Sequence, residues 1–198
     1  MDFNAIIKRV IAIITKPVDE WKVIKEEQMT VVDMYTKYAI ILAAIPAVAG
    51  LIGNLAVGRS FMGHTIRMPF SNSFMWTIFT YILSLGGVYL MGLVIDLLAP
   101  NFGAEKNFIA SLKVALFSYT AAWVAGIFYL IPALSILAMV GGLYSLYLLY
   151  LGIKEVKSPP AEKAMGYFVT VIIVQIVIGF LIGFLVARIA FGSAAAYM

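Results

Sequence analysis

The sequence contains no cysteine, a single histidine and few charged residues. Of its 198 residues, 12% are Asp, Glu, Lys or Arg, which is about half the share found in soluble domains. Without cysteine the chain can form no disulfide and offers no thiolate nucleophile or cysteine metal ligand. One histidine, His64, cannot supply a His-Glu-x-x-His zinc site, which needs two. These absences leave no recognisable catalytic set, and we predict a non-enzymatic protein with no cofactor and no bound metal.

Apolar side chains, in contrast, are abundant. Hydrophobic residues make up 63% of the chain, compared with about 45–50% in a soluble domain. A soluble chain of this length would need a polar face on most of its helices, and the sequence lacks the polar residues for those faces. We therefore predict an all-α membrane protein: a polytopic bundle of five transmembrane helices, preceded by an N-terminal amphipathic helix that lies at the membrane interface.

The predicted spans follow from uncharged runs of about 20 residues, the length that crosses the hydrocarbon core. The run from Val114 to Ile153 is uncharged throughout, and as one helix it would reach about twice that thickness. It must therefore fold back, and Pro132 near its middle is the natural break, because proline removes a backbone donor and biases the preceding residue away from helix. The expected spans are about residues 38–57, 74–96, 113–131, 133–153 and 164–187.

The segment before the first span has a different composition. Lys8 and Arg9 interrupt its apolar pattern, which a cleavable signal sequence would not show, and the run is too short to cross a bilayer. An interfacial helix fits better. We predict three parts: a cytoplasmic N-terminal segment at 1–36, a five-span domain at 37–190 and a short outer tail at 191–198. The apolar residues at helical spacing in the first part are Phe3, Ile6, Ile7, Val10, Ile11 and Ile14.

The basic residues predict the orientation. With the N-terminus in the cytoplasm and five spans, only Arg59, Arg67 and Arg188 of the 14 lysines and arginines lie outside. This is a clear excess of positive charge on the inner side, as the positive-inside rule requires. Because the basic residues sit in short loops beside apolar runs, we expect them to face lipid headgroups, and we predict no nucleic-acid partner.

Three polar residues near or within the spans are candidates for a functional or structural role. Asp96 ends the second span and Lys113 begins the third, so that an ion pair across the short connection is geometrically possible. Such a pair is either structural or part of a conducting path. Gln175 lies within the fifth span, where its amide could bond a neighbouring helix or line a solute path.

Four further residues are candidates for helix packing. Pro46 lies inside the first span and Pro132 between the third and fourth. Gly179 and Gly183 are four residues apart in the fifth span, a spacing that lets two helix backbones approach closely. The contact could lie within the molecule or between two copies, and a homo-oligomer stays open.

Several short motifs occur along the chain: Pro17 with Glu20 and Trp21, Ile45 to Ala47, Tyr89 to Asp96, Lys113 with Ser118 and Tyr119, Leu130 to Pro132, Gly142 to Gly152 with Tyr144 and Tyr150, and Pro160 with Lys163, Ala164 and Tyr167. Together these motifs resemble the Yip-domain family, named for its interaction with Ypt/Rab small GTPases. The likeness extends over residues 15–187 and implies five spans, a cytosolic N-terminus and an outer C-terminus. Eukaryotic members are similar to trafficking adaptors, but this chain lacks their long cytosolic segment and their Asp-Leu-Tyr-Gly-Pro motif, so GTPase binding is not carried over.

Two functions remain in view. The first is a membrane scaffold or adaptor that acts on membrane lipid or on a protein partner at the cytoplasmic side, and this is the function we predict. The alternative is a transporter or channel for a small solute or ion, for which proline and glycine within the spans could break helices around a path. We expect a multi-pass protein of a prokaryotic cytoplasmic (inner) membrane.

Overall fold

The computed structural model describes residues 3–61, 64–66 and 69–192. Within these residues five helical segments are long and apolar enough to cross a membrane, which confirms the predicted all-α, five-span architecture. Their centres agree with the uncharged runs of the sequence, and most extend several residues further, since charged and polar residues prolong the helices beyond the hydrocarbon. The segments are Val31–Ala56, Phe70–Phe102, Phe108–Leu130, Pro132–Lys157 and Ala161–Leu181.

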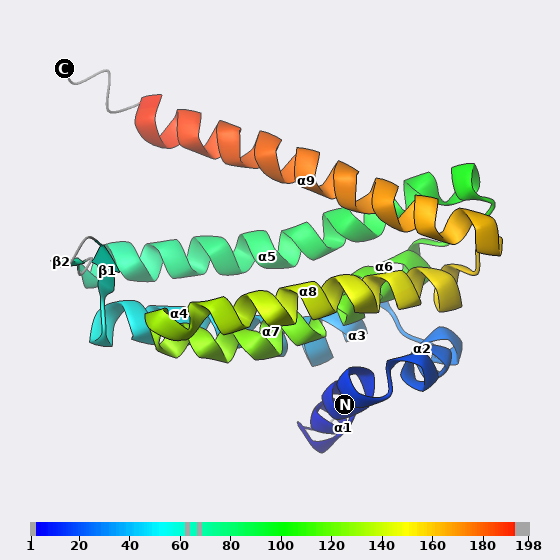
Figure 1. Cartoon of the computed structure of the whole chain (residues 1–198), viewed down its shortest axis with the longest axis horizontal. Coiled ribbons are helices and arrows are strands. Elements are labelled where there is room, and N and C mark those ends of the chain that lie inside the picture. The colour runs from blue at the N-terminus through cyan, green and yellow to red at the C-terminus, as the bar shows by residue number, and fades with distance from the viewer. Residues whose placement is uncertain (1–2, 62–63, 67–68, 193–198) are drawn as a thin grey trace.

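The spans run side by side along the long axis of the molecule, which gives it two distinct ends (Figure 1). At one end the strands β1 (Arg59–Phe61) and β2 (His64–Ile66) form a short antiparallel hairpin between the first two spans. We call this the hairpin end. The opposite end carries α2 (Pro17–Glu26), η2 (Ala99–Phe102) and η5 (Ile153–Lys157), and we call it the basic end because many lysines lie there.

The first span begins with a capping box. The Thr30 hydroxyl accepts a hydrogen bond from the Asp33 amide at 3.1 Å, and the Asp33 carboxylate accepts one from the Thr30 amide at 3.4 Å. This reciprocal pair satisfies two of the amides that a helix start leaves without partners. The span then continues through α3 (Val31–Met34), one π-helical turn η1 (Tyr35–Ala39) and α4 (Ile40–Ala56).

The second and third spans are joined at the basic end. Gly103 lies in the left-handed region, with φ of 72°, and reverses the chain after η2. Asn107 then caps the next helix by accepting a hydrogen bond from the Ala110 amide at 3.0 Å. The elements of these spans are α5 (Phe70–Leu98), α6 (Phe108–Ser118), α7 (Thr120–Ala125) and the 3₁₀ segment η3 (Gly126–Leu130).

The turn between the third and fourth spans lies at the predicted proline. Ile131 is extended, with φ of −121° and ψ of 102°, and Pro132 opens the 3₁₀ turn η4 (Pro132–Leu134). The extended conformation before the proline is the one that its ring favours. The chain then returns along α8 (Ser135–Gly152) to the basic end.

The fifth span, α9 (Ala161–Gly192), is the least enclosed of the five. Near the basic end its Ala164, Tyr167 and Val171 side chains are buried against the bundle, whereas Phe180 is 76% exposed. Figure 1 shows the helix diverging from α5 and α8 as it leaves the basic end. Only 17% of the most apolar window of this span is buried within the chain, so lipid or another protein must cover the rest in the membrane.

The tightest packing lies in the half of the bundle nearest the basic end. Every residue of α6 from Ser111 to Ser118 is buried. The same core cluster includes Trp21 and Ile24 of α2 and Ile6 and Ile13 of α1 (Phe3–Thr15). The N-terminal helices therefore pack into the core of the membrane domain.

Candidate functional site

The N-terminal segment is fastened to the basic end by a buried arginine. The guanidinium of Arg9, on α1, pairs with the carboxylates of Glu20 at 2.6 Å and Glu27 at 2.5 Å. Its carbon atom Cζ also lies 5.7 Å from the centre of the Phe117 ring, within the range of a cation–π contact. Two acids and an aromatic face thus compensate the buried charge and fix α1 relative to α2 and α6.

α1 has apolar residues on more than one side. Ile6 and Ile13 are buried against the protein, but Phe3, Ile7 and Ile11 stay 69%, 41% and 55% exposed. These three recur every four residues and form one stripe. The helix itself is observed; its position at the membrane interface stays a prediction, which this exposed stripe supports.

A tryptophan makes the second attachment of the N-terminal segment. Trp21 of α2 is fully buried, and its ring lies against Gly152, the last residue of α8. A Cβ atom placed at Gly152 would come within 2.8 Å of the ring, so only glycine permits this contact. The Lys25 ammonium adds a hydrogen bond of 2.9 Å to Ser158, just after η5.

Lys113 makes the third attachment. Its ammonium group donates to the backbone carbonyls of Ile24 at 2.8 Å, Lys25 at 3.3 Å and Glu27 at 2.5 Å. These carbonyls lie at the C-terminal end of α2, where the helix leaves acceptors without intrahelical partners and its dipole favours a cation. Lys113 therefore anchors the N-terminal segment.

The ion pair considered between Asp96 and Lys113 does not form in the structure. Asp96 instead lies 3.8 Å from the ammonium group of Lys157 and accepts a hydrogen bond of 3.2 Å from the Ser111 hydroxyl. Lys157 also donates to the carbonyl of Glu105 at 2.6 Å. Sequence spacing suggested Lys113, one loop away, as the partner of Asp96. The fold instead brings Lys157, at the end of the fourth span, beside Asp96. Lys113 is bound to the carbonyls at the end of α2.

The two candidates in the fifth span lie apart from these contacts. Gln175 is half-buried, and its Oε1 atom is buried without a hydrogen-bond partner among the residues that the structure describes. Gly179 faces open space, since a Cβ atom there would meet nothing within 4 Å. The surroundings of Gly183 are outside the described part of the structure. At Gly179, the described residue of the motif, the structure shows no packing contact within the chain.

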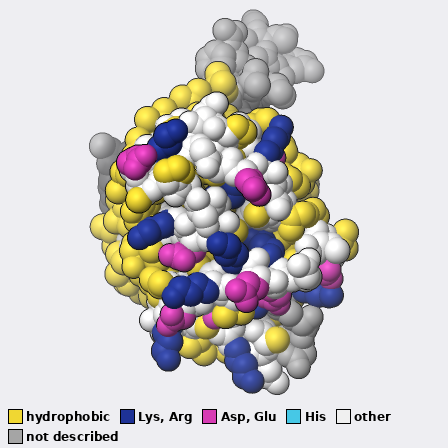
Figure 2. Space-filling model, turned by 90° about the vertical axis from the view of Figure 1, so that its right-hand side faces the viewer, with side chains coloured by type: hydrophobic (Ala, Val, Ile, Leu, Met, Phe, Trp, Pro, Cys, Tyr) yellow, Lys and Arg dark blue, Asp and Glu magenta, His cyan; other side chains and the backbone are white. Residues whose placement is uncertain are grey.

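Seen from the basic end, the molecule presents a surface of mixed charge bordered by apolar side chains (Figure 2). α2 and η5 pack against each other there. Their exposed side chains combine lysines and the acids Asp19 and Glu26 with two valines that are 40% and 53% exposed. We call this patch the α2–η5 surface, and it consists of Val18, Lys22, Val23, Lys25 and Lys154.

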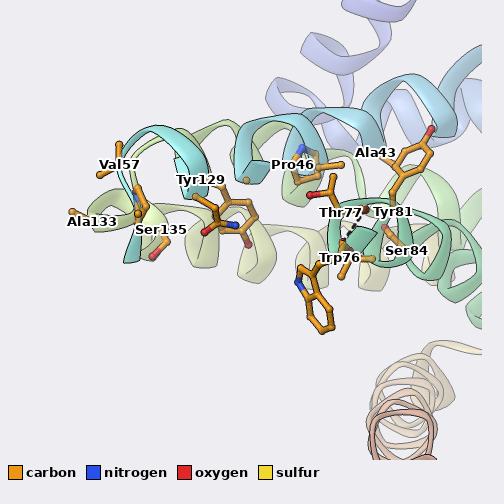
Figure 3. Close-up of a pocket in the computed structure, with 16 residues that line it drawn as sticks. Ala43, Pro46, Val57, Trp76, Thr77, Tyr81, Ser84, Tyr129, Ala133 and Ser135 are labelled. Carbon is orange, nitrogen blue, oxygen red and sulfur yellow. Dashed lines mark hydrogen bonds between the residues drawn. The ribbon is translucent and has the colours of Figure 1, made fainter. Parts of the chain in front are cut away.

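A cavity of about 690 Å³ occupies the other half of the molecule, toward the hairpin end (Figure 3). It lies between α4, α5 and the turn that joins the third and fourth spans, and Pro46 and Pro132 both line it. Neither Asp96, Lys113 nor Gln175 lies at its wall. The described lining residues are Ala43, Pro46, Ala47, Gly50, Asn54, Val57, Gly58, Trp76, Thr77, Thr80, Tyr81, Ser84, Tyr129, Pro132, Ala133 and Ser135.

The sequence did not reveal the contacts of Arg9 and Trp21 at the basic end, or the cavity toward the hairpin end. Arg9 was noted only as an interruption of an apolar helix, and Trp21 only as part of a short family motif with Pro17 and Glu20. A buried arginine between acids at positions 20 and 27 could have been suspected from the cost of leaving its charge unpaired in an apolar helix. No sequence signal locates the cavity, because its wall combines residues from four spans.

Comparison with known proteins places the chain in a family. The family model of the Yip1 domain matches residues 11–187. The chain belongs to the Yip1 domain family. This Yip1 domain protein is also 29% identical over 155 residues to the Inner membrane protein YohC of Escherichia coli strain K12, a match that covers 76% of this chain and 80% of the relative. The same identity and coverage hold for YohC of Escherichia coli O6:H1. No solved structure matches the chain. The Yip-domain resemblance drawn from the short motifs is thus confirmed, and the chain is a protein of this family with five helical segments long and apolar enough to cross a membrane.

Proposed function

We propose that this Yip1 domain protein is a non-enzymatic membrane scaffold that recruits a protein partner to the α2–η5 surface. The observation that carries the proposal is the rigid attachment of the N-terminal segment by Arg9, Trp21 and Lys113. A flexible anchor would not need three separate buried contacts. Their effect is to hold the lysines and exposed valines of α2 and η5 in a fixed arrangement.

The chemistry of the surface favours a partner that is acidic at its rim and apolar at its centre. Lys154 and Lys22, whose ammonium group lies 3.9 Å from the carboxylate of Asp19, supply exposed positive charges, while Val18 and Val23 supply apolar area. Interfaces combine such a polar rim with an apolar centre, and charge complementarity selects the partner and speeds its encounter. The positive-inside rule places this surface in the cytoplasm, which is part of the proposal.

The test is a charge reversal with a matched control. The double variant Lys22→Glu and Lys154→Glu changes two exposed lysines of the α2–η5 surface, whereas Lys106→Glu and Lys163→Glu changes two exposed lysines elsewhere at the basic end. After purification in mild detergent, we expect the first variant to lose its co-purifying protein by about tenfold or more. The control should retain that protein. Equal recovery from both variants, whether high or low, would contradict docking at this surface.

The cavity is the feature that bears on the alternative function, transport of a small solute. A transport path must reach both sides of the membrane, and the cavity occupies only the half toward the hairpin end. In the other half, every residue of α6 from Ser111 to Ser118 is buried. Flux of a solute across liposomes that contain the protein, abolished by filling the cavity, would favour transport over a scaffold.

A further inference from the structure

The cavity near the hairpin end has room that the packing of the protein does not use. Two glycines of α4, three residues apart, show the difference. A Cβ atom at Gly53 would lie 2.1 Å from the carbonyl oxygen of Tyr129, so this glycine is needed for the close approach of α4 and η3. A Cβ atom at Gly50, which lines the cavity, would meet nothing within 4 Å. The space beside Gly50 is therefore open to a ligand.

The wall of the cavity is chemically neutral. None of its described lining residues carries a charge. Three of the four hydroxyl groups on the α5 side already donate to the backbone: Thr77 to the carbonyl of Ser73 at 2.9 Å, Thr80 to that of Trp76 at 2.9 Å and Tyr81 to that of Ile40 at 2.8 Å. The fourth, Ser84, accepts a hydrogen bond of 3.4 Å from the Trp123 ring nitrogen. A ligand that required charged partners would find none in this part of the wall, whereas a hydrocarbon chain requires none.

The mouth of the cavity is continuous with the surface that faces lipid. Trp76 lines the cavity and is 56% exposed, and Val57 and Tyr129, also in the lining, are 47% and 40% exposed. On the adjoining turn of α4, Val48 and Ile52 are exposed as well. Figure 3 shows Trp76 pointing away from the main group of lining residues, at the edge of the site. Bulk lipid therefore has direct access to the space beside Gly50.

From these observations we propose that the cavity binds the acyl chain of one phospholipid from the leaflet on the hairpin side. Its volume of about 690 Å³ lies within the 300–1,000 Å³ range of ligand-binding pockets. Pro46, Ala47 and Gly50 form a floor of small side chains, and Trp76 and Tyr129 flank the entrance. The bound lipid fills the space between α4 and α5 that the protein leaves empty.

Two matched substitutions test this site. Gly50→Leu places a side chain into the cavity, where the first added carbon meets no neighbour within 4 Å. Gly86→Leu makes the same change on α5, at an exposed position that also has no neighbour within 4 Å and does not line the cavity. Both full-length variants are purified in mild detergent, and circular dichroism and gel filtration establish that they are folded.

Native mass spectrometry then counts the phospholipid molecules that remain bound. We expect the unchanged protein and Gly86→Leu to retain one phospholipid, and Gly50→Leu to retain about tenfold less. Equal phospholipid retention in the two variants would overturn the proposal. So would a bound species that Gly50→Leu removes but whose mass identifies a small neutral solute. Because the basic end is untouched, the proposed recruitment of a partner can fail or succeed independently.

Discussion

At the scale of single residues, the buried charges of this protein serve to hold helices together. Lys113 is 5% exposed and gives its ammonium protons to three carbonyls at the end of α2. Asp96 is 7% exposed and is paired with Lys157. In a membrane protein such residues are usually suspected of moving ions. Here each has a partner that explains its presence.

Lys113→Met should therefore destabilise the protein. The substitution leaves the carbonyls of Ile24, Lys25 and Glu27 without their shared donor, at a cost of about 1–3 kcal/mol in the free energy of unfolding. The control is Lys37→Met, which removes an exposed ion pair with Asp33 that contributes little to stability because water screens both charges. Thermal unfolding in detergent measures both, and equal shifts of the midpoint would show that Lys113 does not anchor α2.

At the scale of elements, the contact between α4 and η3 depends on the absence of side chains. Gly126 faces Pro46, where an added Cβ atom would lie 2.4 Å from the proline Cβ. Gly53 faces the carbonyl of Tyr129 at the same crossing. Pro46 thus lies where its helix meets the 3₁₀ segment, and α4 continues through the proline.

Gly53→Ala is expected to destabilise this crossing. The added methyl group would overlap a backbone oxygen that cannot rotate away, and overpacking of this kind costs about 1–3 kcal/mol. Gly86→Ala, at an open helical position, should be neutral or stabilising by up to about 1 kcal/mol, because alanine favours helix. A lower unfolding midpoint for Gly53→Ala, together with an unchanged or higher midpoint for Gly86→Ala, would confirm the close contact. A loss of stability in both variants would contradict it.

At the scale of the whole molecule, the two ends differ in charge and in packing. The basic end is closed by the N-terminal helices, whereas α9 diverges toward the other end and leaves apolar surface uncovered (Figure 1). The exposed positions on α9 include Gly179, so association of two copies through this helix stays a prediction. The uneven lysine distribution gives the bundle a preferred direction of insertion.

The orientation can be tested directly because the chain has no cysteine of its own. Asn101→Cys introduces an exposed thiol at the basic end, and Ser71→Cys introduces one near the hairpin end. We expect a membrane-impermeant maleimide to label Ser71→Cys in cells whose inner membrane is intact and exposed to the reagent. Asn101→Cys should react only after that membrane is broken. The reverse pattern would invert the proposed topology.

The amino-acid sequence by itself determined that lipid surrounds the helices, how many spans there are and that the chain turns at Pro132. These depend on local properties: the length of an apolar run, the missing amide of proline and the spacing of lysines along the chain. The short motifs also indicated the family. All of this can be judged without knowing which helices are neighbours.

Only the tertiary structure decided which side chains meet. Asp96 pairs with Lys157 rather than with Lys113, because the end of the fourth span packs beside the second. Arg9 finds Glu20 and Glu27, and Trp21 finds Gly152, across distances in sequence that no periodicity encodes. The cavity beside Gly50 likewise arises from four spans at once. Helices buried in lipid all have similar apolar surfaces, so close approach at small residues and a few polar contacts set their arrangement, and these are properties of pairs of helices.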